Sequence, residues 1–560
     1  MSRKPRLIAS AIAFPFALTA GLALASALVL LLLQQPLEQF RWHGFWGYWQ
    51  QLDHPQWQPF AGKIKAAGAI GFGLPGLAWL LLLFKSLQSP ERALHGEARF
   101  ASRSDLASKG LLKDHEQGIV VGQIGGERIR LAGQQFVILA APTRSGKGVG
   151  IVIPNLLDYR DSMVVLDIKQ ENFDLTSGWR KSIGHQVFLF NPFAEDRRTH
   201  RWNPLSYVSN DLSFRVSDLQ SIAAMLYPDG DERNKFWTSQ SRNAFLALAL
   251  YLFERHDRQV VETIPIALRK PPTLGRLYRL SSGDGQSELK AYLKTLSEAD
   301  FLSAAGRNAF ATLLSQAPET FASIMGSFKE PLNAWINPVL DAATSADDFR
   351  LDDVRRKRMT IYVGIQPNKL AESRLIVNLF FSQLINVNTK TLPQNDAGLK
   401  HQCLLLMDEF TAIGKVDIIA TAVSYMAGYN LRLLPIIQSL AQLDAVYGRE
   451  HARTLITNHA LQIVFTPREQ QDAQDYSEML GTTTDKRKTV TRGGDVTVGE
   501  QVERRALMLP QELKAMPNDR EIVFYEGIPN PVMAEKIRYY EDAIYKKRLL
   551  PRAEVPAVRV

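Results

Sequence analysis

Residues 136–157 decide the fold of this chain, and they read Phe136-Val-Ile-Leu-Ala-Ala-Pro-Thr-Arg-Ser-Gly-Lys-Gly-Val-Gly-Ile-Val-Ile-Pro-Asn-Leu-Leu157. The apolar run 136–140 has the length of a strand, and the apolar run 149–157 that of a short helix. The glycine-containing segment 141–148 between them predicts a tight loop. A strand, a tight loop and a helix in this order are the setting that a phosphate-binding loop requires.

The side chains of this loop suit phosphate binding. Backbone N–H groups and the helix N-terminus cradle phosphates, Gly146 allows close approach, and the ammonium group of Lys147 reaches the terminal phosphates. Ala141 replaces the usual first glycine, and Gly148 replaces the Ser or Thr whose hydroxyl group ligates Mg²⁺. The alternative is a chance Gly-Lys pair in a helix-capping turn. We expect nucleotide contacts from Pro142, Thr143, Arg144, Ser145, Gly146, Lys147, Gly148 and Val149.

A second element supports a nucleotide site. The apolar run 402–407 predicts a buried strand, and it ends in Asp408 and Glu409. An acidic pair at this position is the Walker B pattern, in which Asp408 holds Mg²⁺ and Glu409 orients or deprotonates the attacking water. The alternative for Asp408 is an ordinary helix cap. The pair of motifs predicts Lys147, Asp408 and Glu409 as catalytic residues.

Three further strand-like runs, 162–167, 433–437 and 460–465, fit the same sheet. Ligands of open α/β sheets gather at the carboxyl ends of the strands. Gln438, which follows the second run, is therefore a candidate to sense the γ-phosphate or position water, so we add it to the catalytic residues. The alternative is an amide that bonds a loop. Asp167 fits a helix cap as well as a catalytic role.

Composition restricts the function classes. The chain has 560 residues and a formal net charge of +9, which permits a nucleic-acid partner without requiring one. Its single cysteine, Cys403, excludes a disulfide within the chain and a zinc site built of cysteines. Residues 7–33 form an uncharged run of 27, and residues 66–84 one of 19. Both suit membrane helices, with a signal peptide as the alternative for the first and a buried helix for the second.

The flanks of these two runs indicate a topology. The segment 34–65 between them holds four tryptophans, which favour the membrane–water boundary. It carries three Lys or Arg residues, whereas the outer flanks carry seven: Arg3, Lys4, Arg6, Lys85, Arg92, Arg99 and Arg103. Positive charge stays on the cytoplasmic side, so both termini are expected in the cytoplasm.

Several ordered segments carry a family resemblance. Besides 142–149 they are His95-Gly-Glu-Ala-Arg-Phe100, Asp167-Ile-Lys-Gln-Glu171, Asn191-Pro-Phe193, Arg201-Trp-Asn-Pro-Leu205, Phe236-Trp-Thr-Ser-Gln240, Met407-Asp-Glu-Phe410, Ile437-Gln-Ser-Leu440 and Lys536-Ile-Arg-Tyr539. With the two N-terminal apolar runs, they make the chain resemble type IV secretion coupling proteins, the TraG/TraD-like ATPases of conjugative DNA transfer.

The resemblance implies an α/β fold, a RecA-like P-loop NTPase domain with an inserted all-α domain, preceded by two transmembrane helices. The scarcity of strand-like runs from 211 to 350 supports the insertion independently. The expected division is a membrane anchor at 1–90 (helices at about 7–33 and 64–84, periplasmic loop 34–63), the RecA-like domain at 91–210 and 351–545, the all-α domain at 211–350, and a C-terminal tail at 546–560.

The resemblance further implies ATP and Mg²⁺ as cofactors and the bacterial inner membrane as location. The implied partners are single-stranded DNA with its relaxase, components of the type IV secretion channel, and five further copies in a homohexamer. Two functions stay open: a motor that drives DNA to the channel by ATP hydrolysis, and a receptor that selects protein effectors while ATP binding mainly controls assembly.

Three smaller expectations remain. The basic residues Lys486, Arg487, Lys488 and Arg492 lie in a Gly- and Thr-rich stretch, which fits either a solvated hairpin or a surface that grips phosphates. Residues 551–560 are expected to form a flexible tail. Ring ATPases usually receive an arginine from the neighbouring subunit, and the candidates are Arg432, Arg449, Arg453 and Arg468.

Overall fold

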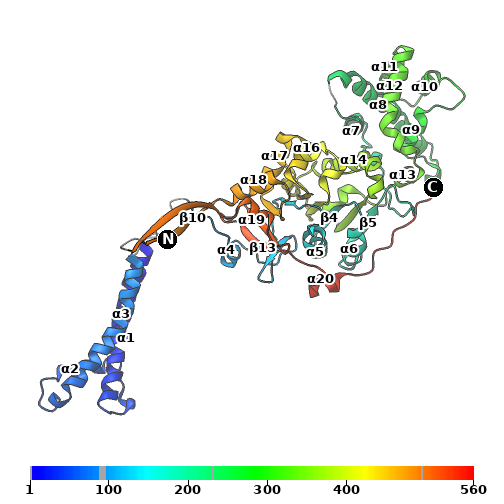
Figure 1. Ribbon diagram of the computed structural model, residues 1–560. Helices are drawn as coiled ribbons and strands as arrows, with labels where there is room; N and C mark the ends of the chain where they lie inside the picture. Colours follow the sequence, from blue (N-terminus) through cyan, green and yellow to red (C-terminus); the bar gives the residue numbers. More distant parts are fainter. Residues whose placement is uncertain (1–2, 88–95, 230–231, 493–495) are drawn as a thin grey trace. The chain divides into compact units, whose positions relative to one another are not determined.

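The computed structural model of the chain describes residues 3–87, 96–229, 232–492 and 496–560 (Figure 1). Side chains are described in these ranges except at 3–9, 85–87, 232, 486–492 and 496–501. The chain separates into two compact units, Met1–Leu94 and His95–Val560. Each unit is described here by itself.

The first unit is a pair of long helices, α1 (Arg3–Leu32) and α3 (Ala61–Leu87), joined by a segment that contains the short helix α2 (Gly44–Gln50). The long helices pack closely because small residues face each other. A Cβ atom placed on Gly71 would lie 2.6 Å from Ala25, so only glycine permits this approach. The indole nitrogen of Trp79 donates to the carbonyl oxygen of Ser10 at 2.9 Å and links the same two helices.

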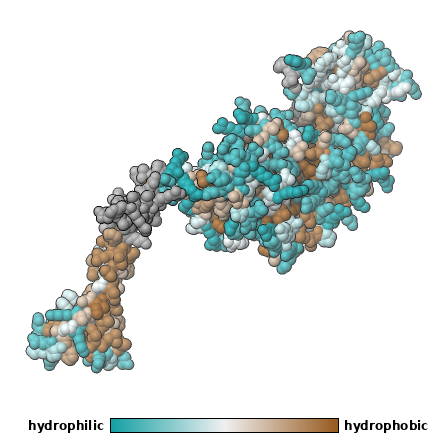
Figure 2. All heavy atoms as spheres, in the orientation of Figure 1, coloured by the Kyte–Doolittle hydropathy of each residue, from teal (hydrophilic) through white to brown (hydrophobic). Residues whose placement is uncertain are grey.

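Both long helices turn apolar side chains outward. Large hydrophobic residues such as Phe16, Leu31, Leu74 and Leu81 are exposed on them, and Figure 2 shows this apolar surface as a brown column. The spans Ser10–Leu32 and Gln58–Phe84 are long and apolar enough to cross a membrane. The two predicted apolar helices are therefore present, and their outward surface suits lipid.

The second unit is built on one sheet of eleven strands in the order β2-β1-β13-β12-β9-β3-β8-β7-β4-β6-β5. The seven strands from β9 to β5 run parallel, and the remaining four pair antiparallel. The strands are β1 (Ile119–Ile124), β2 (Glu127–Leu131), β3 (Val137–Ala140), β4 (Ser162–Asp167), β5 (Gln186–Phe190), β6 (Met359–Gly364), β7 (Cys403–Met407), β8 (Leu431–Ile437), β9 (Leu461–Val464), β12 (Arg520–Tyr525) and β13 (Val532–Glu535).

Burial on both faces explains the nearly continuous apolar runs of the central strands. Successive side chains of a strand point to opposite faces, and they enter two separate cores. In β3, Ile138 and Ala140 join the core beneath α14 (Leu370–Asn388), whereas Val137 and Leu139 join the core beneath α5 (Ile153–Asp158). The strands predicted from the sequence are all present, with small shifts of their ends.

Helices cover both faces of the sheet and connect its strands. Outside the stretch between β5 and β6 they are α4 (Arg103–Ser108), α5 (Ile153–Asp158), α6 (Glu171–Ser182), α14 (Leu370–Asn388), α15 (Asp417–Ala422), α16 (Leu440–Tyr447), α17 (Arg449–Thr457), α18 (Gln470–Leu480), α19 (Pro510–Lys514) and α20 (Ala543–Arg548).

The stretch between β5 and β6 is helical, and its described residues contain no strand. Buried leucines and aromatic residues of α8 form the centre of this group, with Phe310 of α11 and Phe328 of α12 packed in the same core. Figure 1 shows the helices gathered together as a bundle. They are α7 (Leu212–Leu226), α8 (Lys235–Val261), α9 (Leu274–Ser281), α10 (Leu289–Ser297), α11 (Ala304–Leu314), α12 (Pro318–Leu332) and α13 (Pro338–Ala343).

The basic Gly- and Thr-rich stretch forms a two-stranded hairpin, β10 (Thr482–Arg492) and β11 (Val496–Ala506). The side chains of Lys486, Arg487, Lys488 and Arg492 lie outside the described residues. The predicted phosphate-gripping role therefore stays a prediction.

The C-terminal residues differ from the flexible tail that the sequence predicts. Ala553 and Val555 are buried, and the backbone N–H of Ala553 donates to the hydroxyl group of Ser177 on α6. The segment then pairs with 197–199 through two backbone hydrogen bonds, Thr199 to Pro556 and Val558 to Arg197. Two buried apolar residues at alternate positions are a pattern too short to predict an attached segment in a proline-containing terminus.

Candidate functional site

The strand order explains why distant motifs meet. The strands β3, β8, β7 and β4 are neighbours and run parallel, so their carboxyl ends share one edge of the sheet. The phosphate-binding loop follows β3, Gln438 follows β8, Asp408 follows β7, and Asp167 ends β4. All the predicted site residues therefore lie along one line, with Gln438 between the loop and the acidic pair.

The loop after β3 has the backbone of a phosphate cradle. Gly146 has a φ of +88°, which glycine adopts without strain, and Arg144 is also left-handed at +61°. The N–H of Ala141 donates to the carbonyl oxygen of Ile437, which ties the start of the loop to β8. A π-helical turn (η3, Gly148–Val152) follows and leads into α5.

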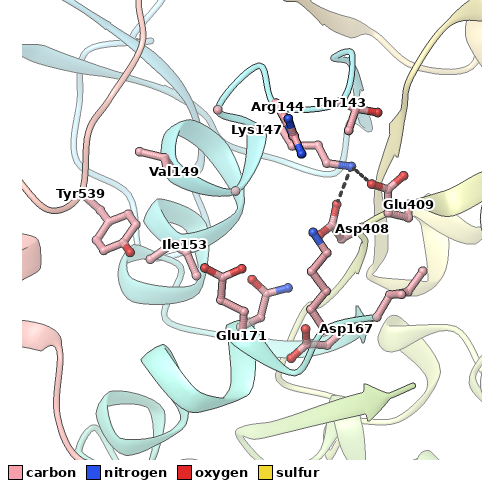
Figure 3. A pocket seen from close by; sticks show the side chains of 15 residues that line it. Thr143, Arg144, Lys147, Val149, Ile153, Asp167, Glu171, Asp408, Glu409 and Tyr539 are labelled. Carbon is pink, nitrogen blue, oxygen red and sulfur yellow. Dashed lines mark hydrogen bonds and ion pairs between the residues drawn. The ribbon is translucent and has the colours of Figure 1, made fainter. Parts of the chain in front are cut away.

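Lys147 lies between the two acidic residues (Figure 3). Its Nζ is 2.5 Å from Oε1 of Glu409 and 3.2 Å from Oδ1 of Asp408. All three side chains are about four-fifths buried or more, so little water screens the attraction. The lysine and the acidic pair, which are 261 and 262 positions apart in sequence, form one ionic cluster.

Gln438 extends this cluster to the loop. Its Nε2 donates to Oε2 of Glu409 at 2.9 Å, and its Oε1 accepts from the hydroxyl group of Thr143 at 3.2 Å. The amide thus bonds a loop residue and also orients the carboxylate expected to act on water. The bond to Thr143 fits the interpretation of Gln438 as an amide that bonds a loop, and the bond to Glu409 fits its interpretation as a residue that helps to position water.

The two carboxyl groups of the acidic pair are shifted in opposite directions. Burial raises the pKa of Asp408, and the nearby charge of Lys147 only partly opposes this effect. Burial also acts on Glu409, but hydrogen bonds from Lys147 and Gln438 outweigh it and lower its pKa. Glu409 is thus held as a carboxylate, the form that a base requires, whereas Asp408 lacks a sufficient cationic partner.

Because Lys147 only partly offsets the burial of the Asp408 carboxyl group, a Mg²⁺ ion bound there would stabilise its charged form. Its Oδ1 is buried and forms an ion pair with Nζ of Lys147 at 3.2 Å, outside strict hydrogen-bond geometry. Among the described residues, no three His, Cys, Asp or Glu side chains are placed to hold a metal ion by themselves. Mg²⁺ is commonly held by one or two carboxylates together with phosphate oxygens and water. The arrangement suits such an ion without the hydroxyl group that Gly148 lacks.

A cavity of about 440 Å³ adjoins the cluster. Asp167 lines it, and burial raises the pKa of this carboxyl group to about 7, even though the N–H of Phe173 donates to it. The cavity is also lined by residues that the sequence analysis did not select as site residues: Ile153, Ile168, Lys169, Glu171, Asn172 and Tyr539. Lys169, Glu171 and Tyr539 belong to segments that carry the family resemblance, which was the available signal.

Lys536 is a further residue that sequence reasoning missed. Its Nζ donates to the carbonyl oxygen of Ser145 at 3.2 Å and lies 3.7 Å from the centre of the Phe465 ring. Lys536 therefore stabilises the backbone of the phosphate-binding loop at Ser145.

Among the arginine candidates, Arg432 is excluded by its position. Its side chain is fully buried, and its guanidinium group donates to the carbonyl oxygens of Gln117, Leu131 and Gln135. It lies near the start of β8, whereas the nucleotide site lies at the end of that strand. Arg449, Arg453 and Arg468 are exposed.

Known proteins resemble this chain over most of its length. The chain is 30% identical over 471 residues to the protein VirD4 of Agrobacterium fabrum, which covers 81% of this chain and 67% of VirD4. It is 26% identical over 556 residues to the conjugal transfer protein TraG of Escherichia coli, which covers 89% of this chain and 85% of TraG.

A solved structure shares the fold. The bacterial conjugative coupling protein TrwBΔN70 superposes with a TM-score of 0.57 at 17% sequence identity, over 80% of this chain and 95% of TrwBΔN70. The RecA-like NTPase fold expected from the sequence is therefore confirmed. The model of the family described as type IV secretory system conjugative DNA transfer matches residues 98–558. With the phosphate-binding loop, the acidic pair and the glutamine on adjacent strand ends, this match shows that the chain belongs to the family of type IV secretion coupling proteins for conjugative DNA transfer.

Proposed function

We propose that the chain is a coupling ATPase of the bacterial inner membrane that recruits relaxase-bound single-stranded DNA and drives it to the secretion channel by ATP hydrolysis. The observation that carries this proposal is the ionic cluster of Lys147, Asp408 and Glu409 with Gln438 attached to it. Such a constellation beside a phosphate cradle is suited to moving a phosphoryl group to water.

The cluster implies a defined exchange of partners. The terminal phosphates of ATP would draw Lys147 away from the carboxylates, because a phosphate group carries more charge than either of them. Glu409 would then be free to accept a proton from water, and Gln438 would keep it oriented. Mg²⁺, held by Asp408 and phosphate oxygens, would neutralise the charge that develops on the phosphate. Structures of TrwB with an ATP analogue and with ADP and Mg²⁺ support this choice of ligands.

The division into domains is part of the proposal. We assign residues 1–90 to a membrane anchor, 91–210 and 351–545 to the RecA-like domain, 211–350 to an all-α domain, and 546–560 to the terminal segment. The absence of described strands between β5 and β6 and the shared core of α8, α11 and α12 support the all-α assignment.

Assembly and location complete the proposal. The nucleotide site lies at the carboxyl ends of the parallel strands, where a neighbouring subunit of a homohexamer could add an arginine. Arg449, Arg453 and Arg468 are the exposed candidates for this role. The two apolar helices would anchor the chain in the inner membrane with both termini in the cytoplasm.

The function is tested by Lys147→Ala and Glu409→Gln in a mating assay, beside the DNA-stimulated ATPase activity of the purified full chain. We expect both variants to lose hydrolysis by at least about a hundredfold and to lose plasmid transfer with it. Lys113→Ala, at an exposed lysine remote from the site, is the matched control. Normal transfer without hydrolysis would refute the motor, and transfer of protein effectors without plasmid mobilisation would favour the receptor function.

A further inference from the structure

The helical bundle contains a second hollow whose lining is unusually basic. It measures about 350 Å³ and is formed by α8, α9, α10 and the segment between α8 and α9. It shares no lining residue with the nucleotide site. Its lining consists of four cations, one amide and three apolar or aromatic residues: Arg255, Lys270, Arg276, Arg279, Gln259, Leu252, Leu280 and Tyr292.

Helix geometry explains how the cations converge. Arg276 and Arg279 are three positions apart on α9 and so lie on one face. Arg255 and Gln259 are four positions apart on α8 and do the same. Lys270 comes from the connecting segment, where its backbone N–H donates to Oε1 of Gln259 at 3.0 Å. The side-chain amide of Gln259 thus holds the backbone of Lys270 beside α8.

Most of this charge is uncompensated. Arg279 pairs with Asp341 at 2.6 Å, and Arg276 donates to the carbonyl oxygen of Pro271. Arg255 and Lys270 have no ion pair within the part of the chain that the structure describes. Burial and the positive charges of Arg279 and Arg255 lower the pKa of Arg276, and Asp341 only partly opposes them. Asp341 pairs with Arg279, and Asp284 is near enough to Tyr292 to act on it electrostatically. Four cations still outnumber these two carboxylates, so the lining favours an anionic ligand.

The surroundings of the hollow limit the size of that ligand. The adjacent arginines are already occupied: Arg215 pairs with Asp257 at 2.6 Å, Arg258 pairs with Glu262 at 2.7 Å, and Arg269 donates to the carbonyl oxygen of Ile264. A strand of DNA needs a continuous basic track along its backbone. Arg255, Lys270 and Arg276 are instead grouped around one hollow, which favours a compact polyanion.

The apolar part of the lining indicates which class of compact polyanion would bind in the hollow. Tyr292 is half-buried and flanks the hollow together with Leu252 and Leu280. An aromatic ring beside aliphatic side chains offers a surface for a flat base, and guanidinium groups offer paired donors for phosphate oxygens. The volume is in the range of pockets that bind small organic ligands.

We propose that this hollow is a second nucleotide-binding site, in which a free nucleoside polyphosphate places its phosphates on Arg255, Lys270 and Arg276 and its base against Tyr292. The site is independent of the P-loop and lies in the helical bundle, so it would make the state of the bundle depend on nucleotide concentration. It goes beyond hydrolysis at Lys147, because it contains no acidic pair and no candidate base.

The proposal is tested by counting the nucleotides that one chain binds. Equilibrium dialysis of the full chain in nanodiscs of zwitterionic lipid, with a radiolabelled non-hydrolysable ATP analogue, measures the number bound per chain. We expect two for the wild type, and one for Arg255→Ala/Lys270→Ala, which should weaken the second site by at least about tenfold. Lys294→Ala/Lys329→Ala, at two lysines of the same bundle that are outside the hollow, is the matched control and should keep two.

A photoreactive azido-ATP locates the sites in the same proteins. Label on the P-loop peptide is an internal control that every variant should keep. Label on peptides of α9 and α10, lost in Arg255→Ala/Lys270→Ala, supports the proposal. A single site in the wild type, or label on α9 and α10 that survives the double substitution, overturns it.

Two further probes, an oligonucleotide and an acidic peptide, test whether the hollow binds DNA or a protein segment instead of a nucleotide. If Arg255→Ala/Lys270→Ala weakens binding of a dT12 oligonucleotide while the wild type binds one analogue per chain, the hollow holds a DNA strand and the proposal is wrong. The same result with a poly-glutamate peptide assigns the hollow to an acidic protein segment and also overturns it. Loss of ATP hydrolysis by Lys147→Ala is independent of all these outcomes.

Discussion

At the scale of single residues, Lys147 stabilises the acidic pair of the nucleotide site. Two buried carboxyl groups next to each other repel, and a cation between them removes much of that repulsion. The same ammonium group is needed by the phosphates of the ligand. Binding therefore replaces one set of ion pairs by another, so the affinity for nucleotide reports a difference between two interactions rather than the strength of one.

Glu521 on β12 leads to a pH-dependent prediction. Its carboxyl group is fully buried and neither oxygen accepts a hydrogen bond, and a Cβ atom on Gly122 would lie 2.2 Å from Oε1. Burial raises the pKa of Glu521 well above its usual range, although Lys536 opposes it. Above a pH of about 4.3, the unfolded chain loses a proton that the folded chain keeps, so the free energy of unfolding falls as the pH rises.

We expect Glu521→Gln to remove this term. The wild type should lose up to about 1.4 kcal/mol per pH unit more than the variant between pH 5 and the folded pKa. Denaturant unfolding at a series of pH values, followed by tryptophan fluorescence, measures the two slopes. Glu526→Gln, at an exposed glutamate of the next turn, is the control and should keep the wild-type slope. Equal slopes for Glu521→Gln and wild type would contradict the assignment.

Individual residues were predictable where a local pattern carries the chemistry. Asp408 and Glu409 directly follow an apolar run, and Lys147 ends the glycine-containing loop after another, so their place near strand ends could be predicted from the sequence. Lys536 and Arg432 could not be assigned in this way. Whether a cation faces a loop carbonyl or is buried among backbone oxygens depends on which strands become neighbours, and the sequence around it does not determine that.

At the scale of elements, residues 549–560, the part of the terminal segment beyond α20, yield a prediction. Their attachment rests on the two buried side chains of Ala553 and Val555, a few hydrogen bonds and an exposed ion pair of Arg552 with Asp174 at 2.9 Å. Val555→Asp would bury an unpaired charge, which is unfavourable by several kcal/mol, so we expect the segment to detach while the sheet remains folded. Trypsin should then cleave after Arg552 at least about tenfold faster.

Limited proteolysis followed by mass spectrometry measures that rate. Glu554→Ala, at an exposed position between the two buried residues, is the matched control and should be cleaved like the wild type. Unchanged cleavage of Val555→Asp would show that the buried valine does not hold the segment.

The parallel strands were more predictable than the antiparallel ones. Burial on both faces makes a parallel strand an unbroken apolar run, such as 162–167 or 402–407. The strands β1, β2, β12 and β13 have only part of their side chains buried, so their runs are mixed and were not predicted. The adjacent glycines Gly125 and Gly126 in the β1–β2 turn were the missed signal for a hairpin.

At the scale of the whole molecule, membrane topology can be tested with the native cysteine in place. Cys403 is fully buried in β7, so an introduced cysteine is expected to give the main labelling signal. We expect a membrane-impermeant maleimide to label Gln50→Cys, in the segment between the two apolar helices, in cells with permeabilised outer membranes. Lys109→Cys, in the second unit, should be labelled only after lysis. The reverse pattern would place the termini outside the cytoplasm.

The terminal segment also closes the side of the sheet that ends at β5. Residues 197–200 lie beside β5, where His200 and Leu189 bond each other, and Arg198 in turn pairs with Ala557. An open strand edge is a template onto which another chain can add a strand, which leads to aggregation. The last ten residues, none of which lines the nucleotide cavity, thus help to cover this edge against the addition of a strand from another chain.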